Sequence, residues 1–159
     1  MYPLILLVIV VVASMLHIWL ERPGSNSRRL VEIFLMYFLV IFVGVTGIMG
    51  FVGHTFFSDR IAGSLGWPTG SPFQFEVAVA HLSFGILGIM SVWFRENFWT
   101  ATGVGSSIYF LGAAYGHAKS ILVYKDLAPY NIGAVFYIGD ILVPLIVIAL
   151  VIAYNVMAE

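Results

Sequence analysis

The side chains best able to do chemistry in this sequence are three histidines and two acids set in otherwise apolar stretches: His54, Glu76, His81, His117 and Asp140. Imidazoles and carboxylates bind metal ions and carry protons, so the set suggests a metal site or a proton relay. A carboxylate at the centre of a bilayer costs roughly 2.5–3.5 kcal/mol, so each acid needs a partner, a proton or water. No local ligand spacing such as HExxH is present, so the fold must bring these residues together.

The elements that would position them are apolar helices. Of the 159 residues, 61% are apolar and 9% are charged, against roughly 45–50% and about 25% in soluble domains. Stretches of about 20 apolar residues cross the ~30 Å hydrocarbon core as helices. Such stretches cover about residues 2–20, 30–53, 73–94, 98–121 and 133–157. We predict an all-α, multi-pass protein of the cell membrane, with five transmembrane helices in one domain, residues 1–159.

The segment between the second and third stretches is too polar and interrupted to span a membrane. Residues 55–72 contain glycines, serines and prolines together with aromatic side chains such as Phe56, Phe57 and Trp67. Such a composition suits the membrane–water interface. We predict a short interfacial helix over residues 56–65, followed by a turn at WPTGSP.

The candidate residues differ in how strongly they suggest function. His117 and Asp140 lie deepest, and Pro144 lacks the N–H that would bond the carbonyl of Asp140, so we expect a kink there. The alternatives are that Glu76 is a first-turn acid favoured by the helix dipole and that His81 is a hydrogen-bonded core histidine. His54, at the end of the second stretch, is as consistent with a side chain hydrated by water as with a functional one.

Small residues on the second stretch suggest close helix packing. Small side chains let helix backbones approach each other in lipid, and the stretch carries Gly44, Gly47, Gly50 and Gly53. We predict a helix-packing face there, through which a homo-oligomer could form. The lipid bilayer is the other expected partner.

Charge and cysteine content exclude several functions. Seven scattered basic residues and a net charge of -1 argue against nucleic acid as a partner. The absence of cysteine excludes disulfides, thiolate catalysis and iron–sulfur clusters. The first residues lack a basic region and a small-residue cleavage site, so we expect a retained helix and no signal peptide. Four basic residues against three across the connections place Met1 outside by the positive-inside rule.

Haem and quinone rank behind a metal ion as cofactors. A haem needs two histidines facing each other at one depth, which His54 with His117, or His81 with His117, would provide. No GxSxG elbow or comparable nucleophile spacing stands out. We therefore expect a protein without enzymatic activity.

Two segments carry a resemblance. At GHTFFSDRIAGSLGWPTGSPFQFEVAVAHLSFGILG and at GHAKSILVYKDLAPYN…FYIGDILVPL the chain resembles a small prokaryotic membrane-protein family described only as a domain of unknown function. The resemblance covers the second to fifth predicted helices and implies no activity.

A more distant resemblance is to the DoxX superfamily. It rests on the glycine-rich helix ending at His54, the Gly/Pro loop, and the helix that opens with Glu76 and continues to Gly85 and Gly88. DoxX proteins are four-helix membrane bundles, some of them subunits of quinone-linked oxidoreductases. The resemblance implies a four-helix core from the second to fifth predicted helices, with the first added. The chain departs from the pattern in that added helix and in His54, where a basic residue is common.

Three functions follow from these observations. The first is a binding protein whose polar cavity, in the outer half of the membrane, takes a proton, a metal cation or a small polar ligand. The second is a membrane subunit of a quinone- or haem-linked redox complex. The third is a structural or assembly role.

Overall fold

The computed structural model describes residues 1–22, 24 and 26–157 and is all-helical. Two segments, η1 and η2, are wound as π-helix and continue into the α-helices beside them. The elements are α1 (Tyr2–Glu21), α2 (Ser27–Tyr37), η1 (Phe38–Val45), α3 (Thr46–Phe56), α4 (Ser58–Leu65), α5 (Phe73–Met90), α6 (Asn97–Tyr124), η2 (Val135–Leu142) and α7 (Val143–Val156). The predicted third helix is shorter than expected, because the chain turns after Met90.

Four helices are long and apolar enough to cross a membrane. They are Tyr2–Glu21, Ser27–Phe56, Phe73–Met90 and Val135–Val156. The chain is therefore a multi-span helical membrane protein. The predicted fourth span corresponds to α6, which has 28 residues but is diluted by glycine, serine and threonine. The 30 residues of Ser27–Phe56 extend about 45 Å, so this helix tilts or projects beyond a hydrocarbon core of about 30 Å.

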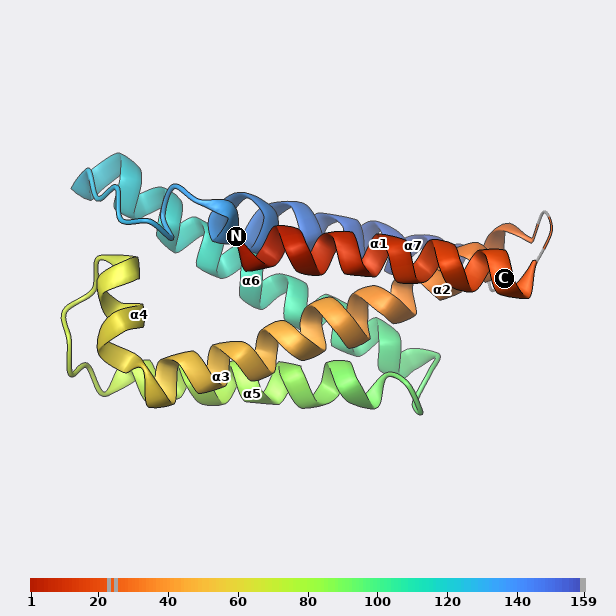
Figure 1. Cartoon of the computed structure of the whole chain (residues 1–159), viewed down its shortest axis with the longest axis horizontal. Coiled ribbons are helices and arrows are strands. Elements are labelled where there is room, and N and C mark those ends of the chain that lie inside the picture. Colours follow the sequence, from red (N-terminus) through yellow and green to blue (C-terminus); the bar gives the residue numbers. More distant parts are fainter. Residues whose placement is uncertain (23, 25, 158–159) are drawn as a thin grey trace.

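The helices form two packed pairs that diverge (Figure 1). The continuous helix α2–η1–α3 packs along α5, and α6 packs along η2–α7. Helices α5 and α6 lie close where the chain passes from one to the other, and separate towards the end that carries α4 (Figure 1). Helix α1 packs against α2, η1 and η2. We call the half where the pairs meet the closed half, and the half near α4, where the helix axes diverge, the open half (Figure 1).

The hydrophobic core fills the closed half. Leu39 and Phe42 of η1 pack with Val147 of α7, Val10 of α1 and Trp99 of α6, and each of these side chains is at least 99% buried. The indole Nε1–H of Trp99 donates a hydrogen bond of 2.8 Å to the carbonyl of Ser91. Because that donor is satisfied, the largest core side chain is buried without loss of hydrogen bonding.

Glycines set the contact between α5 and the helix η1–α3. A Cβ on Gly47 would collide with the backbone of Gly85, and a Cβ on Gly88 would collide with that of Gly44. A Cβ on Gly50 would overlap the ring of His81. The predicted packing face is thus present and is occupied within the chain, with Gly53 facing Ile61 of α4. Oligomerisation through these four glycines stays a prediction.

The helix is wound as π-helix just before Pro144, the residue at which the sequence predicts a kink. Pro144 is the second residue of α7 and is preceded by the π-helical segment that carries Asp140. A proline ring removes one backbone hydrogen bond, and local widening of the helix accommodates the break. The hydroxyl of Ser107 on α6 donates to the carbonyl of Pro144 at 3.2 Å, which ties α6 to the first turn of α7.

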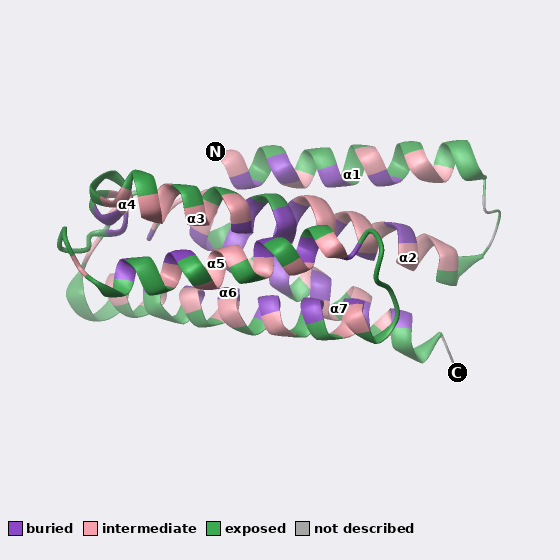
Figure 2. Cartoon of the chain, turned by 90° about the horizontal axis from the view of Figure 1, so that it is seen from below, coloured by how far each residue is buried: buried purple, intermediate pink, exposed green. Residues whose placement is uncertain are grey.

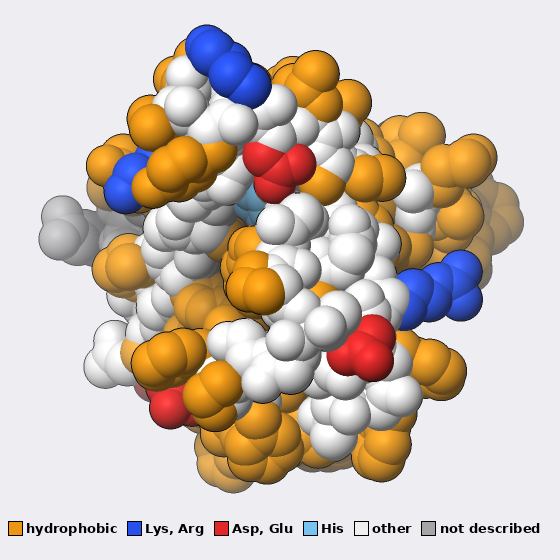
Figure 3. Space-filling model, turned by 90° about the vertical axis from the view of Figure 1, so that its left-hand side faces the viewer, with side chains coloured by type: hydrophobic (Ala, Val, Ile, Leu, Met, Phe, Trp, Pro, Cys, Tyr) orange, Lys and Arg blue, Asp and Glu red, His pale blue; other side chains and the backbone are white. Residues whose placement is uncertain are grey.

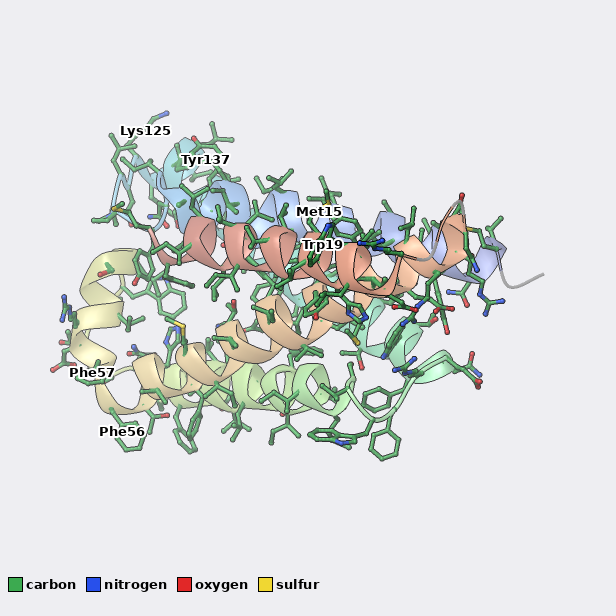
Figure 4. All side chains as sticks on the ribbon, turned by 45° about the vertical axis from the view of Figure 1, so that its right-hand side comes forward. Met15, Trp19, Phe56, Phe57, Lys125 and Tyr137 are labelled. Atoms are coloured by element: carbon green, nitrogen blue, oxygen red, sulfur yellow. The ribbon has the colours of Figure 1, made fainter. Side chains whose placement is uncertain are left out.

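Helix α1 lies on the outside of the bundle. Figure 2 shows that its buried positions form one stripe facing α2 and that much of the remainder is exposed. Its exposed side chains are apolar, including Met15 at 56% and Trp19 at 63% exposure, both labelled in Figure 4. An apolar outer surface of this kind suits contact with lipid.

The short helix predicted after His54 is present as α4, and it closes the open end of the molecule (Figure 1). The amide of Gln74 donates to the carbonyl of Ser58 at 2.7 Å, which ties the start of α5 to α4. From the opposite pair, the backbone N–H of Tyr130 donates to the carbonyl of Ser64 at 3.0 Å. Helix α4 therefore bridges the two diverging pairs. Phe56 and Phe57, at its junction with α3, project outwards (Figure 4).

Candidate functional site

A cavity of about 710 Å³ lies in the open half of the molecule. Its walls come from α1, η1, α3, α5, α6 and η2, and α4 with Trp67 borders it towards the end. In Figure 3, which looks onto that end, part of a histidine side chain is visible between its neighbours. The volume is typical of small-molecule sites. Six aromatic residues line it: Tyr2, Phe42, Trp67, Tyr109, Phe110 and Tyr130.

A buried chain of polar side chains forms one wall. His117, on α6, has its Nε2 atom 3.3 Å from Oδ2 of Asp140 on η2. Its Nδ1 atom lies 2.6 Å from Oδ1 of Asn131, in the connection between α6 and η2. His117 is 9% exposed, Asp140 5% and Asn131 1%, so bulk water does not supply the hydrogen-bond partners of these side chains. The side chains of Asn131, His117 and Asp140 therefore form one connected polar group.

Asn131 fixes the orientation of His117. The Asn131 amide nitrogen donates to the carbonyls of Leu65 at 3.4 Å and Asp126 at 3.3 Å. The amide oxygen therefore faces His117 and accepts a hydrogen bond from Nδ1–H. This leaves Nε2 of the imidazole facing Oδ2 of Asp140, at a distance of 3.3 Å.

The opposite wall carries the other two predicted histidines. The rings of His54, on α3, and His81, on α5, stack with centroids 5.6 Å apart and planes 19° apart. His81 meets the ring of Tyr109 edge-on at 5.2 Å, and His54 lies 6.2 Å from the ring of Trp67. Gly50 makes room for His81 between the two helices, because any side chain there would overlap the imidazole. The histidines are held by packing.

Several polar atoms around the cavity have no hydrogen-bond partner in the described part of the chain. They include Nδ1 of His54, Nδ1 of His81, Oδ2 of Asp140 and Oγ1 of Thr46. Oδ2 of Asp140 lies within ion-pair distance of His117, but the geometry is not that of a hydrogen bond. Buried polar groups are normally paired, and exceptions often mark a site where a ligand or water supplies the partner.

Four of the five predicted site residues line this cavity: His54, His81, His117 and Asp140. Glu76 does not line it and is exposed in the first turn of α5. There its carboxylate faces the positive end of the helix dipole, in agreement with the alternative that it is a first-turn acid.

Metal coordination has limited support in this geometry. Within residues 1–22, 24 and 26–157, no three His, Asp or Glu side chains are grouped closely enough to hold one ion. His117 already directs Nδ1 at Asn131 and Nε2 at Asp140, so ligation would separate one of these contacts. The metal site and the proton relay stay predictions for these five residues.

Asn131 is the site residue that sequence reasoning missed. It stands in a polar connection, VYKDLAPYN, where asparagine is an ordinary turn residue. Its burial comes from the docking of that connection on α4, a contact between residues 66 positions apart. No local pattern distinguishes such an asparagine from one that faces water.

The comparisons with known proteins identify a family without an assigned activity. No curated protein and no solved structure matches the chain. One family model matches residues 1–159, and its description is a family of unknown function. The expectation of an uncharacterised family is confirmed. The chain with this cavity belongs, over its whole length, to the family of unknown function DUF6790.

Proposed function

We propose that the protein is a non-enzymatic membrane protein that binds a small, largely apolar ligand carrying a polar group. The observation that supports this most directly is the cavity of about 710 Å³, in which aromatic walls surround the buried pair His117–Asp140. Sites for small molecules combine apolar surface with a few converging polar groups in this way. The unpartnered polar atoms of His54, His81 and Asp140 are the groups that such a ligand would satisfy.

The packing of the closed half favours binding over conduction. A proton path across the membrane needs polar groups or water along its whole length. The core around Leu39, Phe42 and Val147 has no exposed surface to speak of, and these side chains are apolar. The cavity therefore stops at this core, and the polar side chains His117 and Asp140 lie on the wall that α6 and η2 form.

In this proposal α6 is the fifth membrane span, and the core of the bundle is formed by α2–η1–α3, α5, α6 and η2–α7. The four-helix core agrees with the resemblance to the DoxX superfamily, and α1 is the added helix. The basic residues near the other end of the molecule, Arg22, Arg28, Arg29 and Arg95, place that end in the cytoplasm by the positive-inside rule. The cavity and α4 then lie in the outer half of the cell membrane.

Fluorescence of Trp67 offers a test, because this residue lines the cavity. Bromine quenches tryptophan on contact, so para-bromo-tert-butylbenzene, titrated into protein in lipid nanodiscs, should quench Trp67 saturably. The Trp67→Phe variant reports the quenching of the other three tryptophans, and the difference isolates Trp67.

A filled cavity provides the matching control. Gly116 lines the cavity and Gly63 lies on α4 outside it, and a Cβ on either would meet no atom within 4 Å. Gly116→Leu should remove the saturable quenching, and Gly63→Leu should leave it unchanged. Quenching that is linear in probe concentration, or equal in both variants, would contradict a binding cavity.

A quinone-linked redox subunit is the second candidate. It is favoured by the position of imidazoles on opposite walls, His54 and His81 on one and His117 on the other. A quinone has carbonyl oxygens at opposite ends of a flat ring. The N–H of His81 can donate to one of them, and a proton held by the His117–Asp140 pair can be donated to the other. Duroquinone should then quench Trp67 in the wild type, and both His81→Ala and His117→Ala should weaken this quenching. Equal quenching in the wild type and the two variants would remove this candidate.

A further inference from the structure

We propose that the ligand of this cavity is a lipophilic cation, an amine or quaternary ammonium group attached to an apolar body. The inference rests on the proposed function and specifies the ligand class. Three observations carry it: the charge of the lining, the aromatic side chains in the lining, and the carboxylate oxygen of Asp140 that has no hydrogen-bond partner.

With its histidines neutral, the lining carries a charge of zero or minus one, and no lysine or arginine of the described residues contributes to it. Asp140 is the one acidic residue lining the cavity, and no Lys or Arg lines it within the described part of the chain. A carboxylate that is 5% exposed, with Oδ2 lacking a hydrogen-bond partner, is strongly favoured by a positive charge nearby. An anionic ligand would find no cationic group of fixed charge there.

The aromatic lining favours the same class. Cations are attracted to the faces of tryptophan, tyrosine and phenylalanine, and aromatic cages recognise quaternary ammonium groups. Trp67, Tyr109, Phe110 and Tyr130 line the cavity together with Asp140. The apolar body of the ligand would occupy the space beside Met49 and Ile108, the partly exposed side chains on two edges of the cavity.

The His117–Asp140 pair determines how charge is balanced. When the pair holds one proton in addition to Nδ1–H of His117, it is neutral. Without that proton the pair carries one negative charge. A cation stabilises the second state, so its binding releases a proton from the pair whenever the pair held one. Asn131 accepts the hydrogen bond from Nδ1–H of His117. The proton that is released therefore leaves from Nε2 of His117 or from the carboxyl group of Asp140.

A pair of probes with the same shape and different charge tests this. The para-bromophenyl trimethylammonium ion and para-bromo-tert-butylbenzene differ chiefly in one positive charge, and both report through quenching of Trp67. In nanodiscs of neutral lipid, with Trp67→Phe as the background, we expect the cation to bind at least about tenfold more tightly, after correction for partition into empty nanodiscs. Asp140→Asn should remove this preference and leave the binding of the neutral probe within about twofold.

Glu76→Gln is the matched control, because it removes one negative charge from an exposed position near the same end of the molecule. It should leave the preference unchanged. If both probes bind equally to the wild type, or if Asp140→Asn weakens both alike, the cation inference is overturned while the binding cavity stands. If neither probe binds, the proposed function itself fails.

Discussion

The closed and open halves of the molecule use the same helices in different ways. In the closed half, Trp99 is buried and its indole N–H is bonded to Ser91, and apolar side chains fill the space between helices. In the open half, His54, His81 and Asp140 surround about 710 Å³ of space and keep polar atoms without partners. Ser14 of α1, whose hydroxyl also lacks a partner, departs from this contrast.

The open half is less stable than its helices could make it. Filling the open half with apolar side chains would add burial worth about 25 cal/mol per Å². The chain instead has glycines at positions 112 and 116, where the cavity has room for a side chain. Space and unpaired polar atoms that cost stability are typical of functional sites.

Removal of a large side chain should show the greatest contrast. Trp99→Ala should destabilise the protein by about 3–5 kcal/mol, because it leaves a core cavity and an unpaired Ser91 carbonyl. Ile108→Ala, on the edge of the cavity, should cost far less because this side chain is 66% exposed. Unfolding by heat or denaturant in one detergent compares the two. Similar losses would mean that the open half is packed as tightly as the closed half.

Adding a methyl group should separate the halves in the opposite sense. Gly47→Ala forces a Cβ into the backbone of Gly85 and should cost about 1–3 kcal/mol or more. Gly112→Ala meets no atom within 4 Å and should be neutral or slightly stabilising, since alanine favours helices. Thermal unfolding of both variants checks this. A destabilised Gly112→Ala would show that the space near α6 is smaller than described.

Loss of the Asn131 side chain should loosen the closure at α4. Asn131→Ala leaves Nδ1 of His117 and two carbonyls unpaired and should cost about 1–3 kcal/mol. Hydrogen exchange of α4 should quicken, while exchange in α7 should change little. Unchanged protection of α4 would contradict the idea that this residue connects the site to its closure.

Binding of the ammonium probe should strengthen as the pH rises. Removal of the proton shared by His117 and Asp140 leaves one negative charge, and it is this state that a cation prefers. His54, His81, Tyr2, Tyr109 and Tyr130 also line the cavity, and loss of a proton from any of them as the pH rises would likewise favour the cation. Titration of Trp67 quenching at several pH values measures the trend. The pH dependence of binding should be weaker in Asp140→Asn. An equal pH dependence in that variant would assign the effect to the other groups that line the cavity.

Much of the fold was predictable, because apolar runs of about 20 residues identify helices directly. The short helix after His54 followed from local composition. The number of spans was harder to predict because α6 contains many glycines and serines. These residues let helices pack closely, but they lower the hydropathy by which a span is recognised. The two π-helical segments left no mark in the sequence apart from Pro144.

The site was predictable only as far as depth in the membrane decides it. Residues at similar depth, such as His54, His81, His117 and Asp140, do line one cavity. Whether a side chain turns inward depends on helix rotation, which packing sets, and Glu76 illustrates this by turning outward. Asn131 depends on a loop docking on a distant helix, which a single sequence does not encode locally.

A structure of the protein with the bromine-labelled ammonium probe tests the central claim most directly. The account predicts anomalous bromine scattering inside the cavity, within contact distance of Trp67, with the ammonium group towards Asp140. Bromine found only on the lipid-facing surface of α1 or α6, with the cavity walls collapsed onto each other, would contradict it.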